Sequence, residues 1–162
     1  METEKALKRA ELFLGLDNTD ILRIATLPST QVAEYSSGET MFKNDTRASR
    51  LFVLRKGKVD LVMKTPQGYG QGEGTIVVDR ITTGGCFGWS ALVRPHRYVM
   101  SAVCHEASEV VTINGTELMA LFEEEYRIGY RTLQSLSHII GARLRDTEQA
   151  LVTGNRWPFA GR

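Results

Sequence analysis

The chain has 162 residues, with 20 basic and 19 acidic side chains and a formal net charge of +1. This length is typical of one domain, and the charge balance gives no general attraction to nucleic acid or anionic lipid. Because no apolar run is long enough to cross a bilayer and the charged start does not resemble a secretory signal, we expect a cytoplasmic protein without membrane contact.

Two short amphipathic helices are predicted at the start of the chain. The first covers residues 4–14, where leucine, alanine and phenylalanine recur among charged residues. The second begins at Asn18 or Thr19 and ends before Pro28, because the residue that precedes proline disfavours the helical conformation. We expect its Asp20 to be exposed.

From Gln31 onward the apolar residues alternate as in strands. The apolar runs 51–54 and 59–63 flank a short turn in which Gly57 can adopt a positive φ, and they are predicted to pair as a hairpin. Glycine-rich residues 65–74 predict an exposed loop, and further strands are expected at 75–81, 97–105 and 109–113. Many short strands separated by turns favour a small antiparallel roll.

The last third of the chain is predicted to be helical. Asn114 or Thr116 can cap a helix. A longer helix then runs from about Tyr126 to Val152, with apolar residues at spacings of three, four and seven. A helix of about 25 residues spans roughly 37 Å, which is more than a small roll can cover. We expect its apolar seam to form a homodimer; the alternative is that the seam packs entirely on its own roll.

The region 84–103 has the order of a phosphate-binding cassette: a glycine turn, one short helical turn and a β-rich exit. Gly84, Gly85 and Gly88 allow a ligand to approach the backbone amides closely. A short helix at 90–93 would direct its unpaired N–H groups at an anion. Pro95 would end that turn.

In this order the elements resemble the cyclic-nucleotide-binding domain family, of the catabolite activator and fumarate-nitrate regulator type. The resemblance covers roughly residues 12–150 and rests on residues 35–39, Phe42, 51–54, Gly57, Val59, Gly84, 87–88 and 91–92. It implies a mostly β domain at 1–152: an antiparallel, jelly-roll-like β-roll at about 29–113, flanked by N-terminal helices and by C-terminal helices at about 115–152. Residues 153–162 would form a flexible tail.

The resemblance also implies a set of ligand-binding residues, and several of them depart from the family's pattern. Trp89 stands where the family has a glutamate that accepts a hydrogen bond from the ribose, and an indole can only donate. The family's phosphate-pairing arginine falls on Tyr98 without a gap, or on Arg97 with a shift of one residue. Its following hydroxyl residue falls on Ser101. The implied site residues are Phe87, Gly88, Trp89, Ser90, Ala91, Arg97, Tyr98 and Ser101.

These departures leave two functions open. The first is a regulatory ligand-sensing module with a degenerate cassette, which binds a cyclic nucleotide or another anionic small molecule and signals through its long helix or dimer. The second is a ligand-free scaffold for dimerisation and protein interaction, in which Trp89 fills a lost pocket. Only about ten residues follow Val152, too few for the DNA-binding helices of related regulators, so no direct contact with DNA is expected.

The remaining chemistry-bearing residues give no enzyme signature. Cys86 and Cys104 are expected to be buried thiols, because their spacing fits neither a metal pair nor a disulfide framework. A haem-sensing relative could use histidine, methionine or cysteine as iron ligands. Scattered histidines are ordinary surface or packing residues far more often, so neither a metal nor a bound cofactor is predicted.

Overall fold

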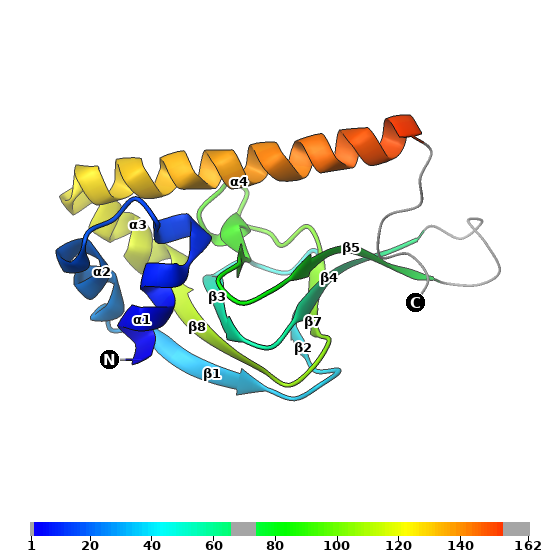
Figure 1. The fold of residues 1–162 in the computed structure, drawn as a ribbon, viewed down its shortest axis with the longest axis horizontal. Helices are drawn as coiled ribbons and strands as arrows, with labels where there is room; N and C mark the ends of the chain where they lie inside the picture. The colour runs from blue at the N-terminus through cyan, green and yellow to red at the C-terminus, as the bar shows by residue number, and fades with distance from the viewer. Residues whose placement is uncertain (1, 66–73, 154–162) are drawn as a thin grey trace.

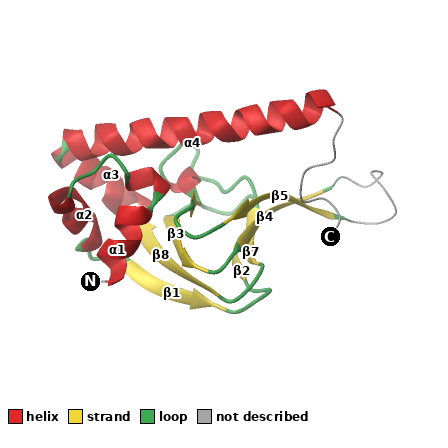
Figure 2. Cartoon of the chain, viewed as in Figure 1, coloured by secondary structure: helices red, strands yellow, loops and turns green. Residues whose placement is uncertain are grey.

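The computed structural model describes residues 2–65 and 74–153, in which helices and strands follow one another much as the sequence predicts (Figures 1 and 2). Most of the predicted loop at 65–74 and nearly all of the predicted tail at 153–162 lie outside the described residues. The elements in chain order are α1 (Glu2–Arg9), η1 (Glu11–Phe13), α2 (Asn18–Ala25), β1 (Gln31–Tyr35), β2 (Thr40–Phe42), β3 (Arg50–Lys56), β4 (Val59–Lys64), β5 (Thr75–Ile81), β6 (Cys86–Phe87), η2 (Trp89–Ala91), β7 (Ser101–Cys104), β8 (Ser108–Asn114), α3 (Gly115–Glu124) and α4 (Tyr126–Thr153).

The strands form two four-stranded antiparallel sheets, ordered β1-β8-β3-β6 and β2-β7-β4-β5. Residues that face one another across the gap between the sheets form the interior of a roll. This arrangement confirms the predicted jelly-roll-like fold, with helices gathered on one side of the strands (Figure 2).

The predicted hairpin of β3 and β4 is wrong, because the two strands belong to different sheets. β3 pairs with β8 and β6, whereas β4 pairs with β5 and β7. Gly57 has the expected positive φ of 98°, but its turn carries the chain from one sheet to the other. An added Cβ would lie 2.4 Å from the Ser108 hydroxyl and 2.6 Å from the Ala107 carbonyl oxygen. The glycine is therefore required by close backbone packing as well as by φ.

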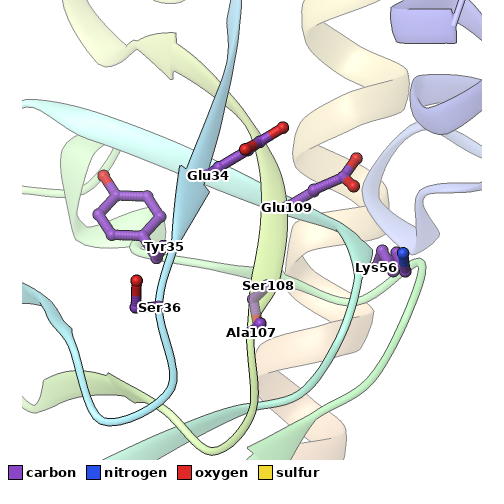
Figure 3. Close-up of a pocket in the computed structure, with 7 residues that line it drawn as sticks. All are labelled: Glu34, Tyr35, Ser36, Lys56, Ala107, Ser108 and Glu109. Carbon is purple, nitrogen blue, oxygen red and sulfur yellow. The ribbon is translucent and has the colours of Figure 1, made fainter.

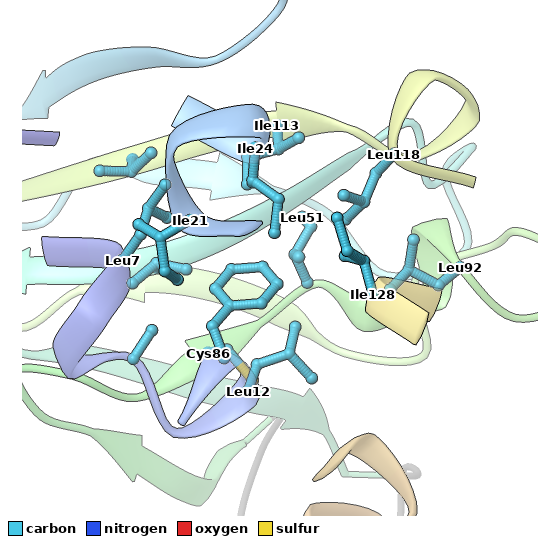
Figure 4. Packing of buried hydrophobic residues seen from close by; sticks show 14 of the residues in the cluster. Leu7, Leu12, Ile21, Ile24, Leu51, Cys86, Leu92, Ile113, Leu118 and Ile128 are labelled. Carbon is cyan, nitrogen blue, oxygen red and sulfur yellow. The ribbon is translucent and has the colours of Figure 1, made fainter. Parts of the chain in front are cut away.

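Two apolar clusters share the strands of the first sheet. One lies between that sheet and the helices and gathers residues from α1, η1, α2, α3 and α4 (Figure 4). The other fills the roll. Along β3, Leu51 and Val53 face the helices, while Phe52 and Leu54 face the roll. This alternation means that a side chain's position in β3 decides which cluster it faces.

The N-terminal helices differ in detail from the prediction. The first helix ends at Arg9 and a separate 3-10 turn follows, whereas α2 begins at Asn18 as expected. Asp20 was expected to be exposed, but it is only 2% exposed. Its carboxylate accepts a hydrogen bond from Arg127 at 2.5 Å. This long-range ion pair, invisible in local periodicity, ties α2 to the first turn of α4.

The long helix α4 lies across one side of the molecule, above the roll and the shorter helices (Figure 1). Leu136 is buried against the helix-side cluster, while Leu133, Leu144 and Leu151 are exposed. The roll therefore covers only part of the predicted seam. Within residues 2–65 and 74–153, no helix is long and apolar enough to cross a membrane.

Candidate functional site

The cassette turn keeps a tightly packed glycine. Gly88 has a φ of 72°, and an added Cβ would lie 2.8 Å from Cδ2 of Phe52 and 3.0 Å from the carbonyl oxygen of Arg50. The 3-10 turn that follows, η2, packs against the start of α3, where an added Cβ on Gly115 would lie 2.5 Å from the Ala91 carbonyl oxygen. The predicted order of glycine turn, short helix and strand is therefore present. Its turn packs against β3 of the roll, and its short helix packs against the start of α3.

The exit segment of the cassette alternates strictly between the two faces. Tyr98, Met100 and Ala102 contact the apolar cluster inside the roll. Ser101 alternates with Ala102 and so lies on the outer face of β7. The predicted residues are thus divided: Phe87, Ala91 and Tyr98 lie inside, while Arg97 and Ser101 do not join them.

Tyr98 occupies the inner position where the family's arginine would fall without a gap. Its side chain is 5% exposed and its ring stacks on Phe42 with centroids 3.8 Å apart. The hydroxyl donates to the Arg50 carbonyl oxygen at 2.8 Å and accepts from the Arg50 N–H at 3.2 Å. Burial raises the pKa of Tyr98 above its usual value, partly opposed by the hydrogen bonds and the charge of Arg50.

Arg97 and Ser101 have partners on the outer surface. The Arg97 side chain is 51% exposed, and its Nε donates to the Asp45 carboxylate at 2.8 Å. Asp45 itself has a positive φ of 61°. The Ser101 hydroxyl accepts a hydrogen bond from the Asn44 N–H at 2.9 Å. An anion inside the roll would have to draw Arg97 away from Asp45 and through the strand.

Trp89 lies on the side of the cassette that faces α4. It packs against the helix-side cluster, and the guanidinium carbon of Arg143 lies 5.9 Å from its ring centroid. Arg143 also donates to the Cys86 carbonyl oxygen at 3.1 Å and pairs with Asp79 at 3.2 Å. The adjacent Ser90 carbonyl lies 3.2 Å from a ring nitrogen of His96. Arg143 therefore joins α4 to β6, to β5 and to η2.

Described residues line one cavity beside α4 and another at the far ends of two strands. A cavity of about 210 Å³ separates the roll from α4 beside Arg143 and Gly85. A larger one, of about 430 Å³, lies by the ends of β1 and β8 (Figure 3). Glu34 and Glu109 face each other across that strand pair and both line the larger cavity. With these two carboxylates against the single ammonium of Lys56, the lining carries more negative than positive charge and does not favour an anionic ligand.

The other chemistry-bearing residues have structural partners. Cys86 is fully buried, and burial raises the pKa of its thiol far above the usual range. Cys104 is also buried. His105 lies 3.2 Å from the Asp60 carboxylate, which holds Arg80 at 2.6 Å. In the part of the chain that the structure describes, no three histidine, cysteine or acidic side chains are placed to hold a metal.

Sequence reasoning did not identify the roles of Arg50 and Arg143. Arg50 stands in β3 and Arg143 in α4, both far in sequence from the cassette, and each contacts it only through the fold. Strand alternation could have indicated the orientation of Arg50, because residues 50, 52 and 54 lie on the same face of a strand. No comparable signal marked Arg143.

The family model for the cyclic nucleotide-binding domain matches residues 32–125. The chain belongs to the cyclic nucleotide-binding domain family. A search among curated proteins returns no match.

Solved structures share the fold of this cyclic nucleotide-binding domain. A candidate cyclic nucleotide-binding protein from Geobacter metallireducens is 25% identical, with a TM-score of 0.71, and the match covers 89% of this chain and 99% of that one. A cyclic nucleotide-binding domain from Methylobacillus flagellatus has a TM-score of 0.78 at 14% identity, over 96% of this chain and 83% of that one. The regulatory domain of a Toxoplasma gondii kinase, solved with cAMP, has a TM-score of 0.68 at 16% identity, and the match covers 86% of this chain and 49% of that one. The fold therefore indicates a regulatory ligand-binding module.

Proposed function

We propose that this domain is a regulatory sensor of a small anionic molecule, bound at the cassette between Gly88 and Tyr98. The observation that carries the proposal is the retained cassette, with Gly88 at positive φ against the backbone of Arg50 and η2 packed on α3. A cyclic nucleotide is the first ligand to test, because the related kinase domain from Toxoplasma gondii was solved with cAMP. The domain itself would catalyse no reaction and would not contact DNA.

Recognition must differ from that of the family's nucleotide-binding members. Trp89 has no acceptor for a ribose hydroxyl and lies toward α4. The missing charged acceptor alone would cost about 1.5 to 3 kcal/mol, which corresponds to roughly a ten- to hundredfold loss of affinity. A cyclic nucleotide would therefore bind more weakly here than in a relative with the glutamate, or another anion would replace it.

Arg143 offers a route from the cassette to α4. Its guanidinium contacts the carbonyl of Cys86, the carboxylate of Asp79 and the face of Trp89. A ligand that moved the cassette turn would change at least one of these contacts. The resulting shift of α4 would be the output of the sensor.

The exposed face of α4 provides a surface for a homodimer. Six large apolar side chains on this helix are at least 40% exposed. All but Val152 fall on a repeat of four and three residues: Tyr126, Tyr130, Leu133, Leu144 and Leu151. Ile140 is half-buried and occupies the same repeat. This spacing is typical of a two-stranded coiled-coil seam. We therefore propose that two copies of the domain pair through α4.

Isothermal titration of the full chain with cAMP and cGMP tests the sensing function. Saturable binding at micromolar concentrations would support it. A parallel fluorescence titration with Trp157→Phe would report on the environment of Trp89 alone. Absence of both heat and a fluorescence change across nucleotides and other small anions would reject the sensing function.

A second candidate, a ligand-free scaffold, is favoured by the aromatic filling of the roll. Four rings contact one another in succession. Tyr98 stacks on Phe42 with centroids 3.8 Å apart, and Phe52 stacks on Phe87 at 5.1 Å. Phe42 and Phe52 join the two pairs in a tilted contact at 5.4 Å. These rings occupy interior volume that a ligand would otherwise use. A stable α4 dimer with no response to any anion would support this scaffold.

A further inference from the structure

We infer that Arg50 supplies the positive charge missing from the cassette, and that the ligand is a small molecule with an anionic group beside a planar ring. This inference rests on the proposed sensing function and names the residue that would pair with the anion. The cassette's own inner position holds Tyr98, which is neutral at physiological pH, and Arg97 is engaged with Asp45.

The pairing register of β3 directs Arg50 toward the roll. From Arg50 to Leu54 the strand pairs with β8 without interruption, from Arg50 opposite Asn114 to Leu54 opposite Val110. Phe52 and Leu54 belong to the cluster inside the roll. Because side chains two residues apart share a face, Arg50 lies on this inner face as well. Arg50 is exposed, so a ligand can reach it at the mouth of the roll.

The backbone of Arg50 is held between the two ends of the cassette. On one side, the Tyr98 hydroxyl bonds to both the N–H and the carbonyl of Arg50, at 3.2 and 2.8 Å. On the other, a Cβ added to Gly88 would lie 3.0 Å from the Arg50 carbonyl oxygen. Tyr98, at the position of the family's arginine, thus acts as a positioning residue for an arginine on the neighbouring strand.

The charge of Arg50 is available to a ligand. Among the ion pairs between described residues, Arg50 has no carboxylate partner. Six other arginines have one: Arg23, Arg55, Arg80, Arg97, Arg127 and Arg143. Burial raises the pKa of Tyr35 and of Tyr98, and the Arg50 guanidinium opposes this rise at both. Its charge therefore acts on two hydroxyls of the roll interior, which is the expected effect of a cation that faces inward.

The surroundings define the chemistry of the ligand. A guanidinium binds a carboxylate or phosphate through two parallel hydrogen bonds. The partly buried side chains that border the roll cluster are apolar, sulfur-containing or aromatic. They include Met41 and Phe42 of β2 and Met100 of the cassette's exit segment. Such side chains contact flat rings well. A nucleoside phosphate and an aromatic carboxylate share this combination.

The decisive experiment compares Arg50→Gln with Arg97→Gln in the full chain. Both variants lose one arginine, but Arg97 pairs with Asp45 on the outer surface. Isothermal titrations use cAMP, cGMP, 5′-AMP and benzoate as anionic probes and adenosine as the uncharged control. We expect the affinity of the best anionic probe to fall roughly ten- to hundredfold in Arg50→Gln and to change less than about twofold in Arg97→Gln. The wild type should bind this probe more tightly than it binds adenosine. Arg50→Lys, which keeps the charge without the planar fork, should fall between wild type and Arg50→Gln.

Failure of the inference is distinguishable from failure of the sensing function. Binding that survives in Arg50→Gln, or that is lost in Arg97→Gln alone, would overturn the role of Arg50 and leave the sensor intact. No binding of any probe by the wild type would overturn both. Preference for benzoate over all nucleotides would support Arg50 while identifying a carboxylate ligand.

A measurement without ligand tests the orientation of Arg50 separately. Circular dichroism establishes that Arg50→Gln is folded, and tyrosine absorbance is then followed as the pH rises. Removal of the cation should move the titration of the buried tyrosines to higher pH. An unchanged titration would show that the guanidinium does not face the roll and would overturn the inference.

Discussion

At the scale of single residues, the orientation of the cassette's exit segment decides which chemistry the site can perform. The sequence identified Arg97 and Tyr98 as alternatives but could not separate them, because a slip of one residue turns every side chain of a strand to the other face. In the structure Tyr98 stacks on Phe42 inside the roll, and Arg97 pairs with Asp45 outside it. Packing of the ring against other strands fixes this register, and that packing is a property of the fold.

Tyr98→Phe should weaken the domain without removing the stacked ring. The variant loses both hydrogen bonds to the backbone of Arg50, and each neutral bond contributes about 1 kcal/mol to the free energy of unfolding. Urea denaturation should show a lower unfolding free energy by about 1 to 2 kcal/mol. Tyr126→Phe, on a side chain that is 80% exposed, is the matched control and should leave the midpoint unchanged. Equal stability of the two variants would show that the Tyr98 hydroxyl does not brace Arg50.

At the scale of elements, the sequence located most strands and helices but not their partners. The alternating apolar residues of β3 and β4 identified two strands around Gly57, yet the strands lie in opposite sheets. A tight glycine turn serves equally well within a hairpin and between facing sheets, because local sequence specifies the turn and not the pairing. The buried Asp20 was missed for a similar reason, since its partner Arg127 lies in α4.

Arg143→Gln should loosen the outer part of α4 from the cassette. Past Arg143, every residue of α4 up to Thr153 is exposed or only half-buried, so few other contacts restrain this segment. Hydrogen exchange of backbone amides at 144–153 should become faster, and the fluorescence of Trp89 should change as its cationic neighbour is lost.

Arg145→Gln, on an exposed arginine of the same helix, serves as the control. If both variants exchange at wild-type rates, Arg143 does not connect the cassette to α4.

At the scale of the whole molecule, the order of elements and a few glycines were enough to predict the family and the roll. Predicting a dimer also requires knowing which apolar residues of α4 remain exposed in the folded domain. Leu136 is buried on the domain's own core, while Leu133 and Leu144 remain exposed on the same helix. The seam read from the sequence therefore divides into an internal and an external part. The external part is the one available to a second copy.

Leu144→Glu should convert the proposed dimer into monomers. A leucine that is 57% exposed in the single domain contributes little to its folding, whereas two glutamates facing each other in a coiled-coil seam would repel. Sedimentation velocity should show about half the wild-type mass. Circular dichroism should show that the monomeric variant is still folded. The control Gln149→Glu, at an exposed polar residue of the same helix, should not alter the mass. A wild-type protein that sediments as a monomer would contradict the α4 dimer.

In the proposed complex, an anionic molecule binds inside the mouth of the roll, between the cassette and Arg50. The most direct test is a two-dimensional NMR titration of the full, isotope-labelled chain with cAMP. We expect saturable shifts centred on the amides of Arg50, Gly88 and Tyr98 and on the Trp89 indole. Shifts confined to the surface around Asp45 and Arg97, or no shifts at all, would contradict it.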